Sequence, residues 1–143
     1  MKTNKLKINF LNLLMLNGNK QTSEKLLIKI SKNFQKKFNK KNFIELFKNG
    51  IINSSPILFF KNIKRKRKKT VEFPFLIKPR LRIFYGTKFM LKNCVYKNNI
   101  SFYLTFKEEL SGSLKKKSVS VKEKKNLHKE AVLKKKFANY RWF

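Results

Sequence analysis

The sequence predicts a mainly α protein: a helical bundle of about six helices with one protruding β-hairpin. The first observation behind this prediction is that apolar residues such as Leu6 and Phe10 recur at the spacing of a helix face through most of the chain. The second is an exception at about residues 57–77, where apolar runs of strand composition flank the consecutive cations Lys64–Lys69. Apolar runs on either side of a polar tip are typical of an antiparallel hairpin.

The N-terminal part of the chain is expected to form a pair of helices. Leu6 and Phe10 lie on one face of the first helix, which should stop at Asn17-Gly18-Asn19 because these residue types favour a turn. Thr22 or Ser23 is a suitable cap for the second helix. The outer face of this second helix, exposed to solvent or to a polyanion, carries Lys25, Lys29, Lys32 and Lys36.

A third helix should lead into the hairpin. Asn42 and Glu45 have the spacing of a capping pair at its start, and Pro56 favours an end shortly before it. The hairpin at about 57–77 follows. Pro74 lies within its second run, and proline is excluded from central strands, so the hairpin should be an edge element or stand clear of the body.

The C-terminal half is expected to add further helices. Pro79 suits the first turn of a fourth helix, and a fifth should begin at about Ser101. The cationic stretch Lys115–Lys125 has few apolar residues and is expected to be a surface loop. A basic C-terminal helix is expected over about 126–141, beginning with the cap Asn126. One face of that helix would hold Leu133, Phe137 and Tyr140.

The charge of the chain indicates a polyanionic partner. The sequence has 37 Lys and Arg residues against 7 acidic residues, a net charge of +30. Such a charge repels itself unless an anion such as a phosphate backbone neutralises it. With 41% hydrophobic residues in 143, the chain can bury a core and is expected to form a single domain over 1–143. Its apolar runs are far shorter than the roughly 20 residues of a membrane-spanning helix, so no membrane partner is expected.

Catalytic groups are scarce in this sequence. It has no Asp, and its only adjacent carboxylates, Glu108 and Glu109, would point in different directions on a helix. His128 is the only histidine and Cys94 the only cysteine, which is too few for a zinc site or a nucleophilic triad. Cys94 is expected to be an apolar packing residue. We therefore expect no enzymatic activity, no cofactor and no metal site.

Three classes of non-enzymatic protein fit a basic helical bundle. An RNA-binding structural protein would place lysines on phosphates and aromatic or arginine planes on exposed bases. A nucleoid-type DNA-binding protein would use the same charges on a duplex without preferring a folded junction. A membrane-surface protein would need unpaired apolar helix faces, whereas those of this sequence fit a core.

Local patterns resemble the small-subunit ribosomal protein S-seven family of bacterial and organellar ribosomes. The first is an apolar run with a turn and a helix start, at 10–20 and Ser23-Glu24-Lys25. The second consists of Asn53, Pro56, the basic hairpin and the step Phe73-Pro74. The most specific is the tail: Val121-Lys122, His128-Lys129, Ala131, Phe137-Ala138 and Tyr140-Arg141-Trp142. The patterns occur in the family's order and span nearly the whole chain.

The resemblance implies a structural role in the small ribosomal subunit. A member of the family is expected to bind the 3′ major (head) domain of small-subunit rRNA, to contact neighbouring head proteins and to support head assembly and translation. Its hairpin is expected near the exit-site tRNA and the path of the mRNA. The residues expected to contact RNA are Lys20, Lys64, Arg65, Lys66, Arg67, Lys68, Lys69, Lys78, Arg80, Arg82, Lys122, Lys124, Lys125, His128, Lys129, Lys136, Tyr140, Arg141 and Trp142.

Residue usage also suggests where the gene resides. Lys, Asn, Phe and Ile are abundant, and their codons are rich in A and T. The N-terminal residues show neither a signal peptide nor an arginine-rich transit peptide, since no arginine precedes Arg65. We therefore expect a mitochondrially encoded protein of the mitochondrial ribosome, with a plastid location second.

Overall fold

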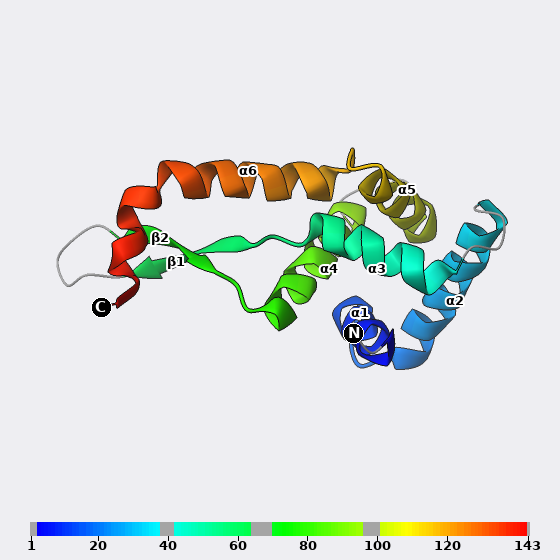
Figure 1. The fold of residues 1–143 in the computed structure, drawn as a ribbon. Helices are drawn as coiled ribbons and strands as arrows, with labels where there is room; N and C mark the ends of the chain where they lie inside the picture. The colour runs from blue at the N-terminus through cyan, green and yellow to red at the C-terminus, as the bar shows by residue number, and fades with distance from the viewer. Residues whose placement is uncertain (1–2, 38–41, 64–69, 96–100, 143) are drawn as a thin grey trace.

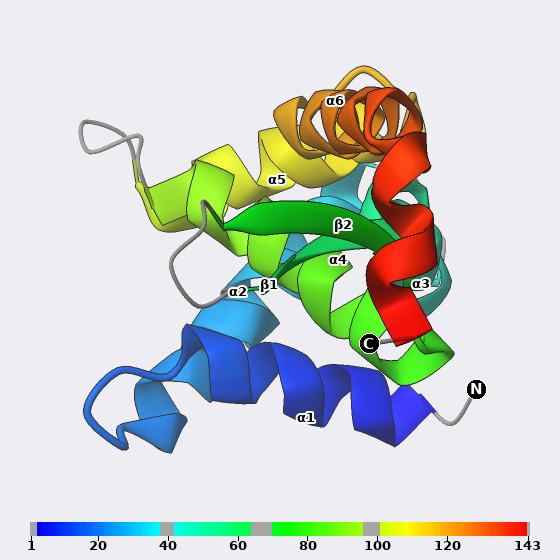
Figure 2. The same cartoon turned by 90° about the vertical axis from the view of Figure 1, so that its left-hand side faces the viewer.

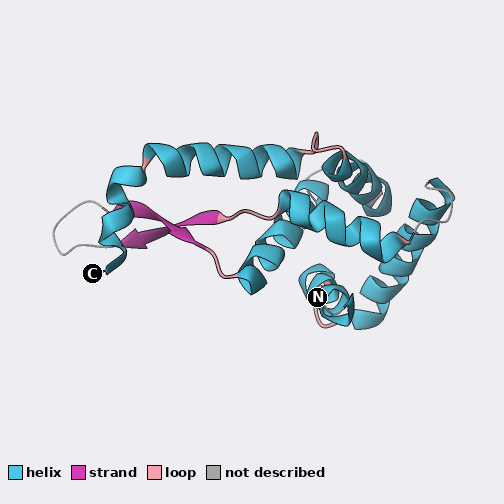
Figure 3. Ribbon diagram, in the orientation of Figure 1, coloured by secondary structure: helices cyan, strands magenta, loops and turns pink. Residues whose placement is uncertain are grey.

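The computed structural model describes residues 3–37, 42–63, 70–95 and 101–142. Within this part, helices dominate and the strands form a single two-stranded antiparallel sheet. The helical bundle lies at one end of the molecule and the hairpin extends from it, so the shape is elongated (Figures 1 and 3). The expected fold class, a mainly α bundle with one protruding β-hairpin, is confirmed.

The described elements follow the predicted order with changed boundaries near the C-terminus. In chain order they are α1 (Thr3–Leu14), α2 (Lys20–Lys37), α3 (Phe43–Ser54), β1 (Leu58–Ile63), β2 (Val71–Leu76), α4 (Pro79–Val95), α5 (Phe102–Leu114), α6 (Val119–Leu133) and the 3₁₀-helix η1 (Lys135–Trp142).

The turn between α1 and α2 forms where the sequence predicts it. Asn17 and Gly18 have φ angles of 50° and 75°, a left-handed conformation that Asn and Gly adopt most readily. The predicted cap of α2 is wrong, because the helix already begins at Lys20. Thr22 and Ser23 lie inside its first turn and donate their hydroxyls back to main-chain carbonyls.

The start of α3 is predicted correctly in position but not in detail. Asn42 is the N-cap residue, yet its side chain makes no capping hydrogen bond. Its carbonyl oxygen instead accepts the backbone N–H groups of Glu45 and Leu46 at 3.1 and 3.2 Å. The helix ends at Ser54, two residues before Pro56, as expected from the restriction that proline places on the preceding residue.

The hairpin has one simple register. Phe60 pairs with Pro74 and Ile63 pairs with Val71, so the missing N–H of Pro74 lies in a two-stranded ribbon and not in a central strand. The tip, Lys64–Lys69, lies outside the described residues. α6 contacts β1, and η1 packs against β2 where it descends from the end of α6 (Figure 2). The hairpin therefore projects from the bundle but is supported by the C-terminal elements.

The core of the bundle is built from aromatic residues of α1, α3 and α5. The ring of Phe10 lies 5.2 Å from the ring of Phe47 and 5.2 Å from that of Phe106, measured between centroids. Phe10 and Phe106 are each 1% exposed, so their full apolar area contributes to stability. Cys94 of α4 is buried in the same cluster, which confirms its packing role.

The C-terminal region departs from the prediction. Only residues 115–118 of the predicted loop 115–125 connect two helices, because α6 begins at Val119 and not at Asn126. Ser118 is its N-cap, and the Ser118 hydroxyl accepts the N–H of Val121. The helix ends at Leu133 and the chain continues as η1, so 126–141 is not one helix. Leu133 is 80% exposed and does not belong to the predicted buried face.

Candidate nucleic-acid interface

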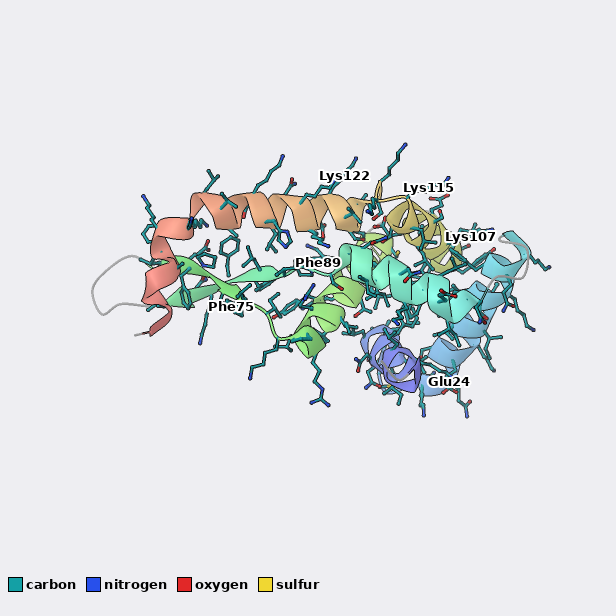
Figure 4. The ribbon with its side chains drawn as sticks, in the orientation of Figure 1. Glu24, Phe75, Phe89, Lys107, Lys115 and Lys122 are labelled. Atoms are coloured by element: carbon teal, nitrogen blue, oxygen red, sulfur yellow. The ribbon has the colours of Figure 1, made fainter. Side chains whose placement is uncertain are left out.

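The outer side of α6 presents a row of cations. Lys122, Lys125 and Lys129 are spaced by three and four residues, which places them on one helix face, and all three are exposed. We call these three residues the basic face of α6. Lys115 at the end of α5 is also exposed and precedes this row (Figure 4). Lysines in such a row can neutralise successive phosphates of a nucleic acid backbone.

Other residues predicted to bind RNA lie on separate parts of the surface. Lys78 and Arg80 are exposed at the start of α4, beside the base of the hairpin, and Lys136 is exposed in η1. Lys20 begins α2 in the bundle, and its Nζ lies 3.9 Å from the Glu24 carboxylate. The helix α6 runs along the hairpin, η1 packs against β2 and α4 begins at the base of the hairpin, whereas α2, which carries Lys20, lies at the opposite end of the molecule (Figure 1).

Two of the predicted residues on α6 face the protein and not solvent. The Nζ of Lys124 donates to the carbonyl oxygen of Asn53 at 3.0 Å. The Nε2 of His128 accepts the backbone N–H of Ile57 at 3.0 Å. Asn53 lies in the last turn of α3, and Ile57 lies in the connection between α3 and β1. Lys124 and His128 thus position the hairpin on α6, and a contact of either residue with RNA remains a prediction.

Burial and neighbouring cations change the acid–base properties of this pair. The pKa of Lys124 is lowered by burial first and then by the charges of Arg82 and Lys116. The pKa of His128 is lowered by burial first and then by the charges of Lys124 and Arg82. A neutral His128 is consistent with its geometry, because an imidazolium could not accept the N–H of Ile57.

Arg82 is only partly exposed, unlike the other cations of the first turn of α4. Its Nε is buried and has no hydrogen-bond partner. The sequence could indicate its charge but not its burial, which depends on the packing of α4 against α6. The charge of Lys116 also lowers the pKa of Lys124. Lys116 is not one of the predicted site residues, and the sequence indicates it only through its place in the basic stretch 115–125.

The remaining predicted residues are not fully described. Lys64, Arg65, Lys66, Arg67, Lys68 and Lys69 lie outside the described residues. Tyr140, Arg141 and Trp142 belong to η1, but their side chains lie outside the described part as well. Among the described residues near the tip, Lys61 of β1 and Thr70 before β2 are exposed.

In the described ranges, no group of three or more His, Cys, Asp or Glu side chains could hold a metal ion. Among the same residues, none of the helices combines the length and the apolarity that crossing a membrane requires.

Comparison with known proteins gives a consistent result. The family model described as ribosomal protein S7p/S5e matches residues 1–135. The protein named small ribosomal subunit protein uS7 from Wigglesworthia glossinidia brevipalpis is 29% identical over 133 residues, which cover 93% of this chain and 84% of the relative. Proteins of the same name from Blochmanniella pennsylvanica and Chlamydia caviae are 29% and 26% identical with the same coverage.

Proposed function

The chain belongs to the ribosomal protein S7p/S5e family, and on that premise we propose that it is a structural, non-catalytic protein of the small ribosomal subunit that binds the RNA of this subunit. The names of the relatives support the proposal. The observation that carries it is the match of the family model to residues 1–135, which include the hairpin and the basic face of α6. A nucleoid-type DNA-binding role is not favoured by this match.

The physical mechanism is charge neutralisation on a rigid support. Lysine is a point charge with little base specificity. The basic face of α6 would therefore bind along a phosphate backbone without recognising the base sequence of the RNA. Lys124 contacts the last turn of α3 and His128 contacts the α3–β1 connection, and these contacts hold the base of the hairpin against α6. The described part of the hairpin is thereby held against the helix that carries the basic face, which favours one folded RNA shape over others.

A finer assignment within the subunit is part of the same proposal. The 3′ major (head) domain of the rRNA is the expected binding site, with the hairpin directed toward the exit-site tRNA and the mRNA path and with a role in head assembly. The projecting hairpin and its cationic tip sequence support this, because such an element can reach beyond the surface that binds rRNA (Figure 1).

Neighbouring head proteins are proposed as further partners. Leu76 of β2 is 59% exposed, and Val132 and Leu133 at the end of α6 are 67% and 80% exposed. An apolar groove lies beside them, lined by residues that include Pro74, Phe75 and Ala131. Exposed apolar residues that gather next to a groove are typical of a protein contact.

A mitochondrial location is proposed from codon-driven residue usage, with a plastid location second. The abundance of Lys, Asn, Phe and Ile supports it. Fractionation of the source cells tests it: the protein should sediment with the small ribosomal subunit of the organelle. Sedimentation only with subunits from another compartment would contradict the location and leave the ribosomal role intact.

A competition assay tests the RNA partner itself. The purified chain is bound to a labelled transcript of the 3′ major domain of small-subunit rRNA, and unlabelled competitors are added at fixed ionic strength. The other rRNA domains and duplex DNA of equal phosphate content should compete at least about tenfold less well. Equal competition by duplex DNA would support the nucleoid alternative and contradict the ribosomal role.

A further inference from the structure

A cluster of basic side chains lies where α4 and α6 meet at the base of the hairpin. Arg82 belongs to the first turn of α4, and Lys124 and His128 lie one turn apart on α6. The helices α4 and α6 are in contact. The charge of Arg82 acts on both Lys124 and His128, so these three side chains lie within electrostatic reach of one another. We call them the Arg82 cluster.

Among the described residues, Arg82, Lys124 and His128 form no ion pair with an acidic side chain. The ion pairs found there, Lys20 with Glu24 and Lys134 with Glu72, lie elsewhere. The groups bonded to Lys124 and His128 are a neutral carbonyl in the last turn of α3 and a neutral amide of the α3–β1 connection. Folding therefore brings like charges together without an internal counter-ion, which is unfavourable unless a ligand supplies one.

An unpartnered donor in the cluster points to an anion. The Nε of Arg82 is buried, and no acceptor for it exists among the described residues. A buried donor without an acceptor is unfavourable, and native proteins rarely retain one without a reason. The guanidinium group has its donors in a planar fork that matches the oxygens of a phosphate.

We propose that the Arg82 cluster is a specific binding site for one phosphate group, supplied by the RNA backbone. The guanidinium of Arg82 would donate to the phosphate oxygens, and the ammonium of Lys124 would neutralise the remaining charge. The inference rests on the proposed RNA-binding function for the source of the phosphate. It goes beyond that function by assigning a partly buried subsite, distinct from the exposed basic face of α6, at the joint that orients the hairpin.

The site would couple RNA binding to the position of the hairpin. Lys124 and His128 already contact the residues that lead into β1. A phosphate held between α4 and α6 would remove the repulsion across this joint and strengthen it. The hairpin would therefore be held more firmly in the complex than in the free protein, because the counter-ion arrives with the RNA.

The only histidine of the chain reports on this site without RNA. Sulfate is a tetrahedral dianion that does not titrate near neutral pH, so it can stand in for a phosphate while the His128 ring protons are followed by NMR across pH. In sulfate the pKa of His128 should rise by about half a unit or more relative to chloride of equal ionic strength, because a bound anion favours the charged ring. The rise should saturate with sulfate concentration. An equal pKa in both salts would overturn the proposal.

Matched variants distinguish sulfate binding at the Arg82 cluster from nonspecific attraction of sulfate to a protein with a charge of +30. Arg82→Gln should abolish at least half of the sulfate effect, whereas Lys88→Gln, which removes an exposed charge of the same helix, should leave it unchanged. Arg82→Lys keeps the charge but lacks the guanidinium fork, so it should show a weakened effect. The far-ultraviolet circular dichroism spectrum checks that each variant is folded. A full sulfate effect in folded Arg82→Gln would overturn the assignment.

Failure of this inference differs from failure of the proposed function. If sulfate has no specific effect while the chain still selects the rRNA transcript, the subsite is wrong and the RNA-binding role stands. If sulfate binds as expected while the transcript competes no better than duplex DNA, the subsite stands as an anion site and the proposed function is wrong.

Discussion

The carboxylate of Glu109 in α5 accepts the backbone N–H of Ser120 in α6 at 2.9 Å and also accepts the Ser120 hydroxyl. Ser120 lies in the first turn of α6, where backbone N–H groups have no partner within the helix. A carboxylate at this end also interacts favourably with the helix dipole. Glu109 therefore fixes the start of α6 from a neighbouring helix, and the basic face of α6 begins at the next turn.

Removal of the Glu109 carboxylate should destabilise the protein. Glu109 is 8% exposed, so Glu109→Ala leaves a buried N–H and a buried hydroxyl unpaired. We expect a loss of about 1–3 kcal/mol in the free energy of unfolding, measured by urea denaturation. Glu108→Ala is the matched control, because Glu108 is the adjacent, exposed acid and should cost less than about 0.5 kcal/mol. Equal losses in the two variants would contradict the capping role.

A close approach of α3 and α4 depends on a glycine. A Cβ atom at Gly86 would lie 2.6 Å from the Ser55 hydroxyl oxygen and 3.0 Å from the Ile51 carbonyl oxygen. Alanine favours a helix over glycine by about 1 kcal/mol, but here the added methyl group must push the helices apart. Gly86→Ala should therefore lower the free energy of unfolding, by about 1–3 kcal/mol. Lys88→Ala, at an exposed position of α4, should change it little; a stabilised Gly86→Ala variant would show that the helices separate without cost.

The stability of the protein should depend on pH through His128. Burial and the charges of Lys124 and Arg82 lower its pKa below the ordinary value of 6.5. The unfolded chain then binds the proton more tightly than the folded chain, so stability is fully present above pH 6.5 and is lost as pH falls through this value toward the folded pKa. Urea midpoints between about pH 5 and 8 should show this loss. His128→Gln should flatten the profile, and an unchanged profile in that variant would assign the dependence to other groups.

The comparison of sequence with structure shows which features are local. The turn at Asn17 and Gly18, the start of α4 at Pro79 and the hairpin around Pro74 follow from residue type and near neighbours, and all form where predicted. The start of α6 does not, because part of what stabilises it is Glu109, which lies eleven residues before Ser120 in another helix. The low apolar content between 115 and 125 favours a loop, whereas Ser118, a residue type typical of N-caps, is the local signal for the start of α6.

The candidate site divides in the same way. The sequence itself shows the positive charges of the basic face of α6. The spacing of Lys122, Lys125 and Lys129 places them on one face once this segment is known to be helical. The inward contacts of Lys124 and His128 cannot be predicted from the sequence, because their partners are backbone atoms about seventy residues away along the chain. Sequence alone treats all cations of this stretch alike, whereas packing separates those that are free to meet RNA from those that hold the hairpin.

Neutralising the basic face of α6 should weaken RNA binding in a salt-dependent way. Each lost phosphate contact should reduce the slope of log affinity against log salt concentration by about 0.7 to 0.9. Lys122→Gln, Lys125→Gln and Lys129→Gln combined should thus lower it by about 2 to 3. The matched control combines Lys25→Gln, Lys32→Gln and Lys36→Gln, which remove the same charge from exposed positions of α2. If both triple variants lower the slope equally, the effect reflects net charge and not the basic face of α6.

The cationic tip of the hairpin should contribute to RNA binding separately from α6. Replacing Lys64–Lys69 by Gln should lower the salt slope by about 0.7 to 0.9 for each phosphate contact that is lost. If the tip and α6 bind separate phosphates, their contributions to the slope should add in a variant that joins both sets of changes. The slope is measured by filter binding of the 3′ major domain transcript over a range of salt concentrations. An unchanged slope in the tip variant would remove the hairpin from the rRNA interface and leave it free to contact tRNA or mRNA.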